Sequence, residues 1–182
     1  ADSLFYASMT GAEAGLLIVV ADDPSMHSSQ NEQDTRRYAK FARVPCLDPA
    51  DSQEAKDMVR LGLELSERLD TPVILRLTTR ISHSSTLVAM PSERVTRAPA
   101  SAKYPRDPTK YVMVPANAYR RHPAIEERTA AVAEWAETVE CNRIEMAGAE
   151  LGIITCGVGY QYAKQVLPNA SFLKLGLTYP LP

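Results

Sequence analysis

Residues 21–37, with the sequence ADDPSMHSSQNEQDTRR, are almost wholly polar and directly follow an apolar run at residues 16–20. This order predicts a loop that leaves a buried strand and opens a helix. Ser29 and Glu32 have the spacing of a capping box, in which each side chain binds an unpaired backbone N–H at a helix start. We therefore expect a helix that begins near Gln30, with its partly positive end suited to phosphate or carboxylate.

The flanking segments alternate between strand and helix patterns. The continuous Leu, Ile and Val run at 16–20 is typical of a strand buried on both faces. A short strand is expected at 43–47, at a sheet edge because Pro45 lacks a backbone N–H. An amphipathic helix at 51–69 and a third strand at 72–77 follow. Strands and helices that alternate with short connections predict an α/β fold with a parallel sheet.

Loops that follow parallel strands lie on one edge of the sheet, which places residues 22–30 and 80–84 on the same side. His27 lies in the first of these loops and is a candidate proton donor or acceptor, or a hydrogen-bond partner for a ligand carboxylate. His83 is a second candidate, and Arg80 can hold a carboxylate or phosphate with a two-pronged contact. The alternative interpretation is that these histidines are solvent-exposed loop residues without a ligand.

Composition narrows the class of protein. The chain has 182 residues, of which 45% are hydrophobic and 23% charged, and its net charge is −2, so no bulk attraction to nucleic acid or membrane is expected. No apolar run approaches the roughly 18 residues that cross a bilayer. The chain does not open with Met, which suggests a piece of a longer polypeptide. Three cysteines without close spacing predict neither a disulfide framework nor a metal site. They indicate a reduced, cytoplasmic setting.

Between residues 80 and 121 the chain changes character, with repeated prolines and eight Lys or Arg residues against Glu93 and Asp107. Interleaved tyrosines raise the possibility of nucleic-acid binding. A proline-stiffened basic strap that connects two domains is the favoured interpretation, because no stacking-platform fold accompanies the tyrosines. A helix that opens at His122 and Pro123 and carries Trp135 on its apolar stripe is expected to follow.

A second strand–helix–strand unit is predicted from 151 to 177, with a tight turn at Gly157-Val158-Gly159. The two glycines are a weak dinucleotide signal, since the third glycine of the fingerprint is absent. The expected organisation is therefore one α/β domain at 1–90, a crossover and linker helix at 91–143, and the start of a second α/β domain at 144–182.

Several of these segments together resemble a known family. They are residues 22–36 of the polar loop, Asp48 to Glu54, Thr78 to His83, 151–162 and 173–182. These sequences resemble the alpha subunits of indolepyruvate:ferredoxin oxidoreductases, which are thiamine-diphosphate enzymes. The resemblance implies that residues 1–90 are part of a pyrimidine-binding domain and that 144–182 open a transketolase C-terminal-like domain.

The resemblance also implies a reaction. Enzymes of this family oxidatively decarboxylate an aryl 2-oxoacid such as indolepyruvate, pass electrons through [4Fe-4S] clusters to ferredoxin, and transfer the acyl group to coenzyme A. The implied cofactors are thiamine diphosphate and Mg²⁺, and the implied partners are the remainder of the alpha subunit, a beta subunit and ferredoxin. The family's activating glutamate, its diphosphate-and-magnesium motif and its cluster cysteines are missing here, so we expect this chain to be inactive alone.

On this interpretation the polar loop faces cofactor and substrate. His27 is the catalytic candidate, and the residues expected to line the site are Ser25, Ser28, Ser29, Gln30, Arg80 and His83. The alternative is a non-catalytic α/β module that binds a ligand or holds subunits together.

Overall fold

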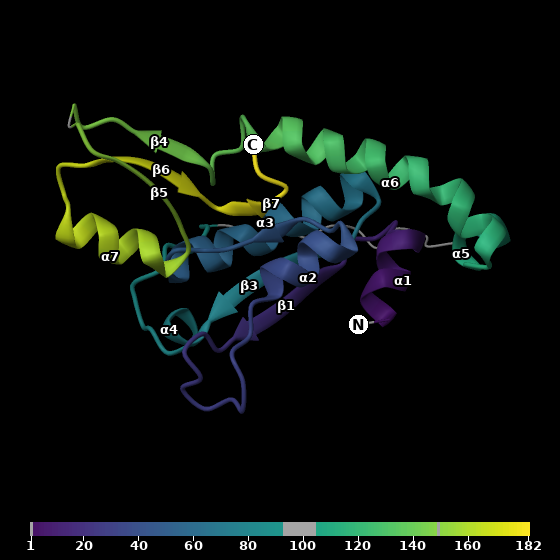
Figure 1. The fold of residues 1–182 in the computed structure, drawn as a ribbon, viewed down its shortest axis with the longest axis horizontal. Coiled ribbons are helices and arrows are strands. Elements are labelled where there is room, and N and C mark those ends of the chain that lie inside the picture. Colours follow the sequence, from purple (N-terminus) through teal and green to yellow (C-terminus); the bar gives the residue numbers. More distant parts are fainter. Residues whose placement is uncertain (1, 93–104, 149) are drawn as a thin grey trace.

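The computed structural model describes residues 2–92, 105–148 and 150–182 (Figure 1). Its elements in chain order are α1 Asp2–Thr10, β1 Leu17–Asp22, α2 Thr35–Ala42, β2 Cys46–Leu47, α3 Ser52–Leu69, β3 Val73–Thr78, α4 Thr79–Ser82, α5 Pro108–Tyr111, α6 Pro115–Ala136, β4 Arg143–Glu145, β5 Gly152–Cys156, α7 Val158–Val166, β6 Ser171–Leu175 and β7 Leu177–Tyr179. Within the described ranges, no helix is long and apolar enough to cross a membrane.

The first sheet has the strand order β1-β3-β2-β7. β1, β3 and β2 are parallel, as predicted, and β7 adds in the antiparallel sense. Two expectations about this sheet are wrong. β1 is an edge strand with Val19 exposed, so it is not buried on both faces. β2 is interior, because Pro45 precedes the strand and its carbonyl accepts the Ile74 N–H at 2.8 Å, so its missing N–H leaves no gap in the ladder.

Helix α2 begins at Thr35, not near Gln30, and the predicted capping box does not form. Asp34 is the N-cap, and its carboxylate accepts the Arg36 N–H. The Ser29 N–H instead donates to the carboxylate of Asp23 at 2.8 Å. The residues that resemble a helix start are therefore held in the loop by an acid at the end of β1.

Helix α3 forms as the sequence predicts. Asp51 accepts the Glu54 N–H at 2.9 Å, which satisfies one unpaired donor of the first turn, and the Glu54 carboxylate reaches back to accept the N–H of Ala50, just before the N-cap, at 2.8 Å. The helix ends at Asp70, which adopts the left-handed conformation. The apolar stripe of α3 packs against the sheet in a core that contains Leu47, Met58, Leu65, Val73, Leu75, Val132, Ala136 and Leu177.

On the opposite side of the first sheet lies a second core cluster under α1 and α2, formed by Ala39, Ala42, Val44, Cys46 and Ile74. Cys46 is buried there, and burial raises the pKa of its thiol to about 12. Cys141 and Cys156 are partly exposed.

Helix α6 begins at Pro115, seven residues before the predicted start at His122, and it contains Pro123. Pro115 occupies the first turn, where a missing N–H has no helical partner to lose, so it is the better start signal. Ile125 and Val132 are buried on the expected stripe. Residues 93–104 of the predicted basic strap lie outside the described residues.

The second sheet has the order β4-β6-β5, with β5 parallel and β4 antiparallel to β6. Helix α7 connects β5 to β6 and covers one face, where Tyr160 packs edge-on against Phe172 (Figure 1). The chain then leaves β6, crosses Gly176 and enters the first sheet as β7, which pairs with β2. The two sheets are therefore neighbours joined by continuous backbone.

Candidate functional site

The loops after β1 and β3 meet at one edge of the first sheet, as the parallel topology predicts. Asp23, at the start of the first loop, accepts the N–H groups of Ser28 at 2.8 Å and His27 at 3.1 Å, and the hydroxyl of Thr79 at 2.7 Å. The Ser28 N–H and then the Thr79 hydroxyl hold the pKa of Asp23 well below its usual range. One carboxylate thus shapes the first loop and ties it to the start of α4.

A cavity of about 890 Å³ opens beside these loops. It is lined by four groups of residues: His27 and Ser28 from the first loop; Thr79, Arg80, Ile81, His83, Ser84, Thr86 and Leu87 from α4 and the segment after it; Ala50, Asp51 and Gln53 at the start of α3; and Val158, Gln161 and Tyr162 from α7. The cavity therefore lies between the edge of the first sheet and the helix of the second.

Four of the seven residues singled out from the sequence line this cavity, namely His27, Ser28, Arg80 and His83. The other three do not. Ser25 is exposed and adopts a left-handed conformation with φ of 68°. The Ser29 N–H donates to the carboxylate of Asp23, and Gln30 is exposed on the loop. The loop thus turns one side to the cavity and the other to solvent.

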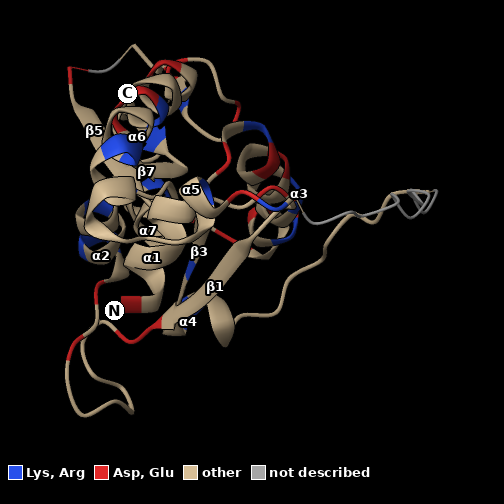
Figure 2. Cartoon of the chain, turned by 90° about the vertical axis from the view of Figure 1, so that its right-hand side faces the viewer, with Lys and Arg blue, Asp and Glu red and all other residues tan. Residues whose placement is uncertain are grey.

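Sequence reasoning missed a buried ionic cluster within the first sheet. The Arg76 guanidinium, from the middle of β3, donates to Asp22 at 2.5 Å and to Asp48 at 2.9 Å. Asp22 also accepts the N–H of Thr35 at 2.7 Å. All three charged side chains are buried. Figure 2 shows acidic segments at the end of β1 and a basic segment within β3.

One sequence feature could have revealed this cluster. Each of the three apolar strand patterns contains a charged residue or is directly followed by one, and a parallel sheet brings these strands side by side. Burial raises the pKa of Asp48, although the positive charge of Arg76 acts in the opposite direction. The Asp22 carboxylate accepts a further hydrogen bond, because the Thr35 hydroxyl also donates to it, at 2.5 Å. The cluster therefore fixes the ends of β1 and β2 against the middle of β3.

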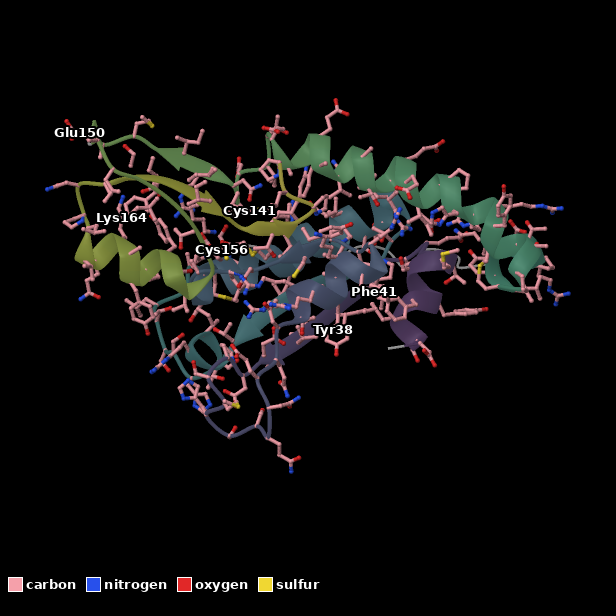
Figure 3. The ribbon with its side chains drawn as sticks, viewed as in Figure 1. Tyr38, Phe41, Cys141, Glu150, Cys156 and Lys164 are labelled. Carbon is pink, nitrogen blue, oxygen red and sulfur yellow. The ribbon has the colours of Figure 1, made fainter. Side chains whose placement is uncertain are left out.

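A second ionic group connects α2 to the second sheet. The Arg36 guanidinium binds both oxygens of Asp34, at 2.8 and 2.9 Å, and lies 3.6 Å from the Cys156 sulfur. Figure 3 shows Cys156 where the second sheet approaches the first. Gly157, the next residue, adopts a φ of 53°, and a Cβ there would lie 2.7 Å from an Asp48 oxygen. Glycine is required at this turn by both conformation and space.

The cavity has the chemistry of a site for an anionic ligand. Arg80 supplies a permanent positive charge, two imidazoles supply hydrogen bonds, and the N-terminal ends of α3 and α7 contribute to the wall. Asp51 is the acid in the lining, and its carboxylate is engaged by the Glu54 N–H and the Gln161 amide. In the part of the chain that the structure describes, no group of three or more His, Cys, Asp or Glu residues is arranged to hold a metal ion.

No protein-family model matches the chain. Curated relatives do match it over its full length. It is 44% identical over 191 residues to indolepyruvate oxidoreductase subunit IorA of Thermococcus kodakarensis, 40% over 189 residues to that of Archaeoglobus fulgidus, and 39% over 187 residues to that of Methanothermobacter thermautotrophicus. In each case the match covers 100% of this chain and 30% of the relative.

Among solved structures, the chain is similar to a 2-oxoglutarate:ferredoxin oxidoreductase from Magnetococcus marinus, which was solved with 2-oxoglutarate, coenzyme A and succinyl-CoA bound. The TM-score is 0.62 at 18% sequence identity, and the match covers 99% of this chain and 40% of that one. This likeness confirms the predicted α/β fold. The resemblance to alpha subunits of indolepyruvate oxidoreductases is confirmed by the curated relatives.

Proposed function

We propose, on the premise of full-length similarity to indolepyruvate oxidoreductase subunits, that this chain is part of a 2-oxoacid:ferredoxin oxidoreductase that acts on aryl 2-oxoacids. The identity of 39–44% across the whole chain carries the proposal. The chain spans about 30% of the length of these relatives, so the activity belongs to a larger assembly. That assembly converts an indolepyruvate-type acid and coenzyme A to an acyl-CoA and CO₂, and it passes electrons to ferredoxin in the cytoplasm.

The cofactors proposed for the complete enzyme are thiamine diphosphate with Mg²⁺ and [4Fe-4S] clusters. When bound, thiamine diphosphate supplies the stabilised carbanion on which decarboxylation of a 2-oxoacid depends. The cavity residues do not fit this cofactor as a whole, because the aminopyrimidine needs a free carboxylate partner and Asp51 is already engaged at the start of α3. We therefore assign the cavity to the substrate side of the active site, with the cofactor contacts provided by other parts of the assembly.

Five of the lining residues then have defined roles. The Arg80 guanidinium binds the carboxylate of the 2-oxoacid, since paired N–H donors match a carboxylate. His27 donates a hydrogen bond to the keto oxygen and is the group that moves a proton there. His83 and the hydroxyl of Ser28 complete the polar wall, and Ile81 offers an apolar surface. We assign Ser25, Ser29 and Gln30 a structural role, in the conformation of the loop that carries His27.

The test uses the complete oxidoreductase with Arg80→Ala and His27→Ala, assayed with indolepyruvate, coenzyme A and ferredoxin. Loss of a charge-assisted hydrogen bond predicts a KM for indolepyruvate raised about tenfold or more in Arg80→Ala. We expect His27→Ala to lower kcat more than it raises KM. Arg60→Ala is the matched control, because Arg60 is an exposed arginine on α3.

Unchanged kinetics in both variants would show that the cavity is not part of the active site. Absence of thiamine diphosphate uptake by the complete protein would instead reject the enzyme assignment and favour a non-catalytic ligand-binding or subunit-interaction module.

A further inference from the structure

One carboxylate serves both loops that open onto the cavity. Asp23 is only 5% exposed, and each of its two oxygens accepts two hydrogen bonds. Oδ1 accepts the His27 N–H at 3.1 Å and the Thr79 hydroxyl at 2.7 Å. Oδ2 accepts the N–H groups of Ser28 and Ser29, both at 2.8 Å. Four donors fill the acceptor capacity of an ionised carboxylate, so Asp23 has no position left for a ligand.

The first loop bends so that the three consecutive N–H groups of residues 27–29 point at this carboxylate. Ser25 and Met26 precede them with φ of 68° and 54°, a left-handed conformation that residues other than glycine adopt infrequently. Converging N–H groups of this kind form a concave anion site. In this loop the anion is Asp23 itself, so the loop backbone is not available to the carboxylate of a ligand. The cavity therefore binds such a ligand through side chains, of which Arg80 carries a permanent positive charge.

The Thr79 hydroxyl connects the second loop to the first. Thr79 opens α4 and directly precedes Arg80. Its hydroxyl shares Oδ1 of Asp23 with the N–H of His27, although Thr79 lies 56 positions from Asp23 in the sequence. The same hydroxyl lies 3.4 Å from the Asp22 carbonyl, which is a longer and weaker contact. The imidazole of His27 and the guanidinium of Arg80 are therefore both carried by backbone that is held at one oxygen atom.

We propose that Asp23 is a positioning residue that sets the distance between His27 and Arg80, and that the Thr79 hydroxyl is the link between their loops. This inference rests on the proposed function, in which Arg80 binds the carboxylate of the 2-oxoacid and His27 acts at its keto oxygen. These two groups of the substrate lie on adjacent carbon atoms, so the two side chains have to be placed relative to each other. A misplacement of about 1 Å can lower the rate of an enzyme about a hundredfold.

The test uses the complete oxidoreductase, assayed with indolepyruvate, coenzyme A and ferredoxin. Thr79→Val nearly keeps the shape of the side chain and leaves the three N–H bonds of Asp23 in place, but it removes the link between the loops. We expect the KM for indolepyruvate to rise about tenfold, because Arg80 is no longer held in place, and kcat to change less than about threefold. Thr79→Ser restores the hydroxyl and should recover at least about half of the wild-type kcat/KM.

A positioning role requires that the effect of Thr79→Val disappears when Arg80 is absent. In the Arg80→Ala background, Thr79→Val should leave the KM unchanged within about twofold, because the group that it places has been removed. A hydroxyl that only stabilises the fold would instead change the kinetics by the same factor in both backgrounds. Equal factors in the two backgrounds would overturn the proposal.

Asp23→Asn releases both loops. The amide offers one oxygen to four donors, so we expect kcat to fall and KM to rise together, with kcat/KM lowered about a hundredfold. Hydrogen exchange provides a measurement without turnover, and the amides of residues 27–29 should exchange at least about tenfold faster than in the wild type. Thr79→Val loses a single hydrogen bond, and it decides the question if Asp23→Asn does not fold.

Asp107→Asn is the matched control. The Asp107 carboxylate accepts the N–H groups of Thr109 and Lys110 and the Thr109 hydroxyl, so it resembles Asp23 in its donors, but it caps α5 and does not line the cavity. We expect wild-type kinetics and wild-type exchange at residues 27–29 in this variant.

Failure of this inference differs from failure of the proposed function. Wild-type kinetics in Asp23→Asn and Thr79→Val, together with a raised KM in Arg80→Ala, would overturn the inference alone. Unchanged exchange at residues 27–29 in Asp23→Asn would overturn it as well, because the loop would then not depend on this carboxylate. Wild-type kinetics in Arg80→Ala and His27→Ala would reject the proposed function, and the inference would fail with it.

Discussion

Arg76 shows how a single residue organises the edge that carries the cavity. A guanidinium inside a strand is desolvated, which works against its charge, but Asp48 and Asp22 outweigh that effect and raise its pKa. Neither acid could be buried alone at acceptable cost. Because the two acids follow β2 and end β1, the cluster sets the positions of two loops at once.

Replacing Arg76 with Met tests this role. The variant keeps an unbranched apolar stem but removes the guanidinium, which leaves two buried carboxylates without a counter-charge. We expect it to lower the free energy of unfolding by about 3–5 kcal/mol near neutral pH. The loss should shrink at acidic pH, because protonated acids no longer require a positive partner. Urea unfolding at both pH values measures it. Arg60→Met on the exposed face of α3 should stay within about 0.5 kcal/mol of the wild type, and an equally small change for Arg76→Met would contradict the argument.

At the scale of elements, the sequence predicts what local residues decide. Helix α3 begins where Asp51 caps the Glu54 N–H and Glu54 accepts the Ala50 N–H, and these contacts join residues at most four positions apart. The start of α2 was predicted wrongly because a distant contact decides it. Asp23 receives the N–H groups of the Ser28–Ser29 segment and is itself held by Thr79, 56 positions away. The position of a strand in the sheet is likewise decided by distant contacts. β1 is at the edge because it pairs with β3 alone.

The candidate site divides in the same way. His27, Arg80 and His83 reach one cavity because parallel strands send their following loops to one edge, which the alternation of strands and helices already implies. Arg76 was missed because a charge within a short apolar run carries no local sign of its partners. The contribution of α7 to the cavity could not be predicted either, because it depends on how the second sheet lies against the first.

Gly157 offers a test at the turn between β5 and α7. A Cβ at this position meets Asp48, and the backbone conformation is one that other residues adopt only with strain, so Gly157→Ala should cost about 2 kcal/mol or more. Gly152→Ala, at the start of β5 and five residues before the turn, is the matched control. A Cβ there has no neighbour within 4 Å, and its φ is not left-handed. Thermal unfolding of the pair measures the difference, and equal midpoints would show that the turn tolerates a side chain.

At the scale of the molecule, the two sheets are joined by charge as well as by backbone. Lys174 is fully buried in the second sheet, and its ammonium lies between the Glu54 carboxylate and the Cys141 carbonyl. Burial alone would raise the pKa of Glu54, but Lys174 and the Ala50 N–H outweigh it and lower that pKa. The same carboxylate therefore closes the first turn of α3 and anchors the second sheet beside the cavity.

A double-mutant cycle with Lys174→Met and Glu54→Gln measures this connection. Each single change leaves the other group without its partner, so the effects should not add, and we expect a coupling of about 1–3 kcal/mol in the free energy of unfolding. The exposed pair Arg60 and Glu64 provides the control cycle, where a coupling of about 0.5 kcal/mol or less is expected. If the two cycles gave equal couplings, the position of the second sheet would be set by backbone and apolar contacts alone. A large coupling would mean that α7 is held at the cavity by an ion pair whose members lie 120 positions apart.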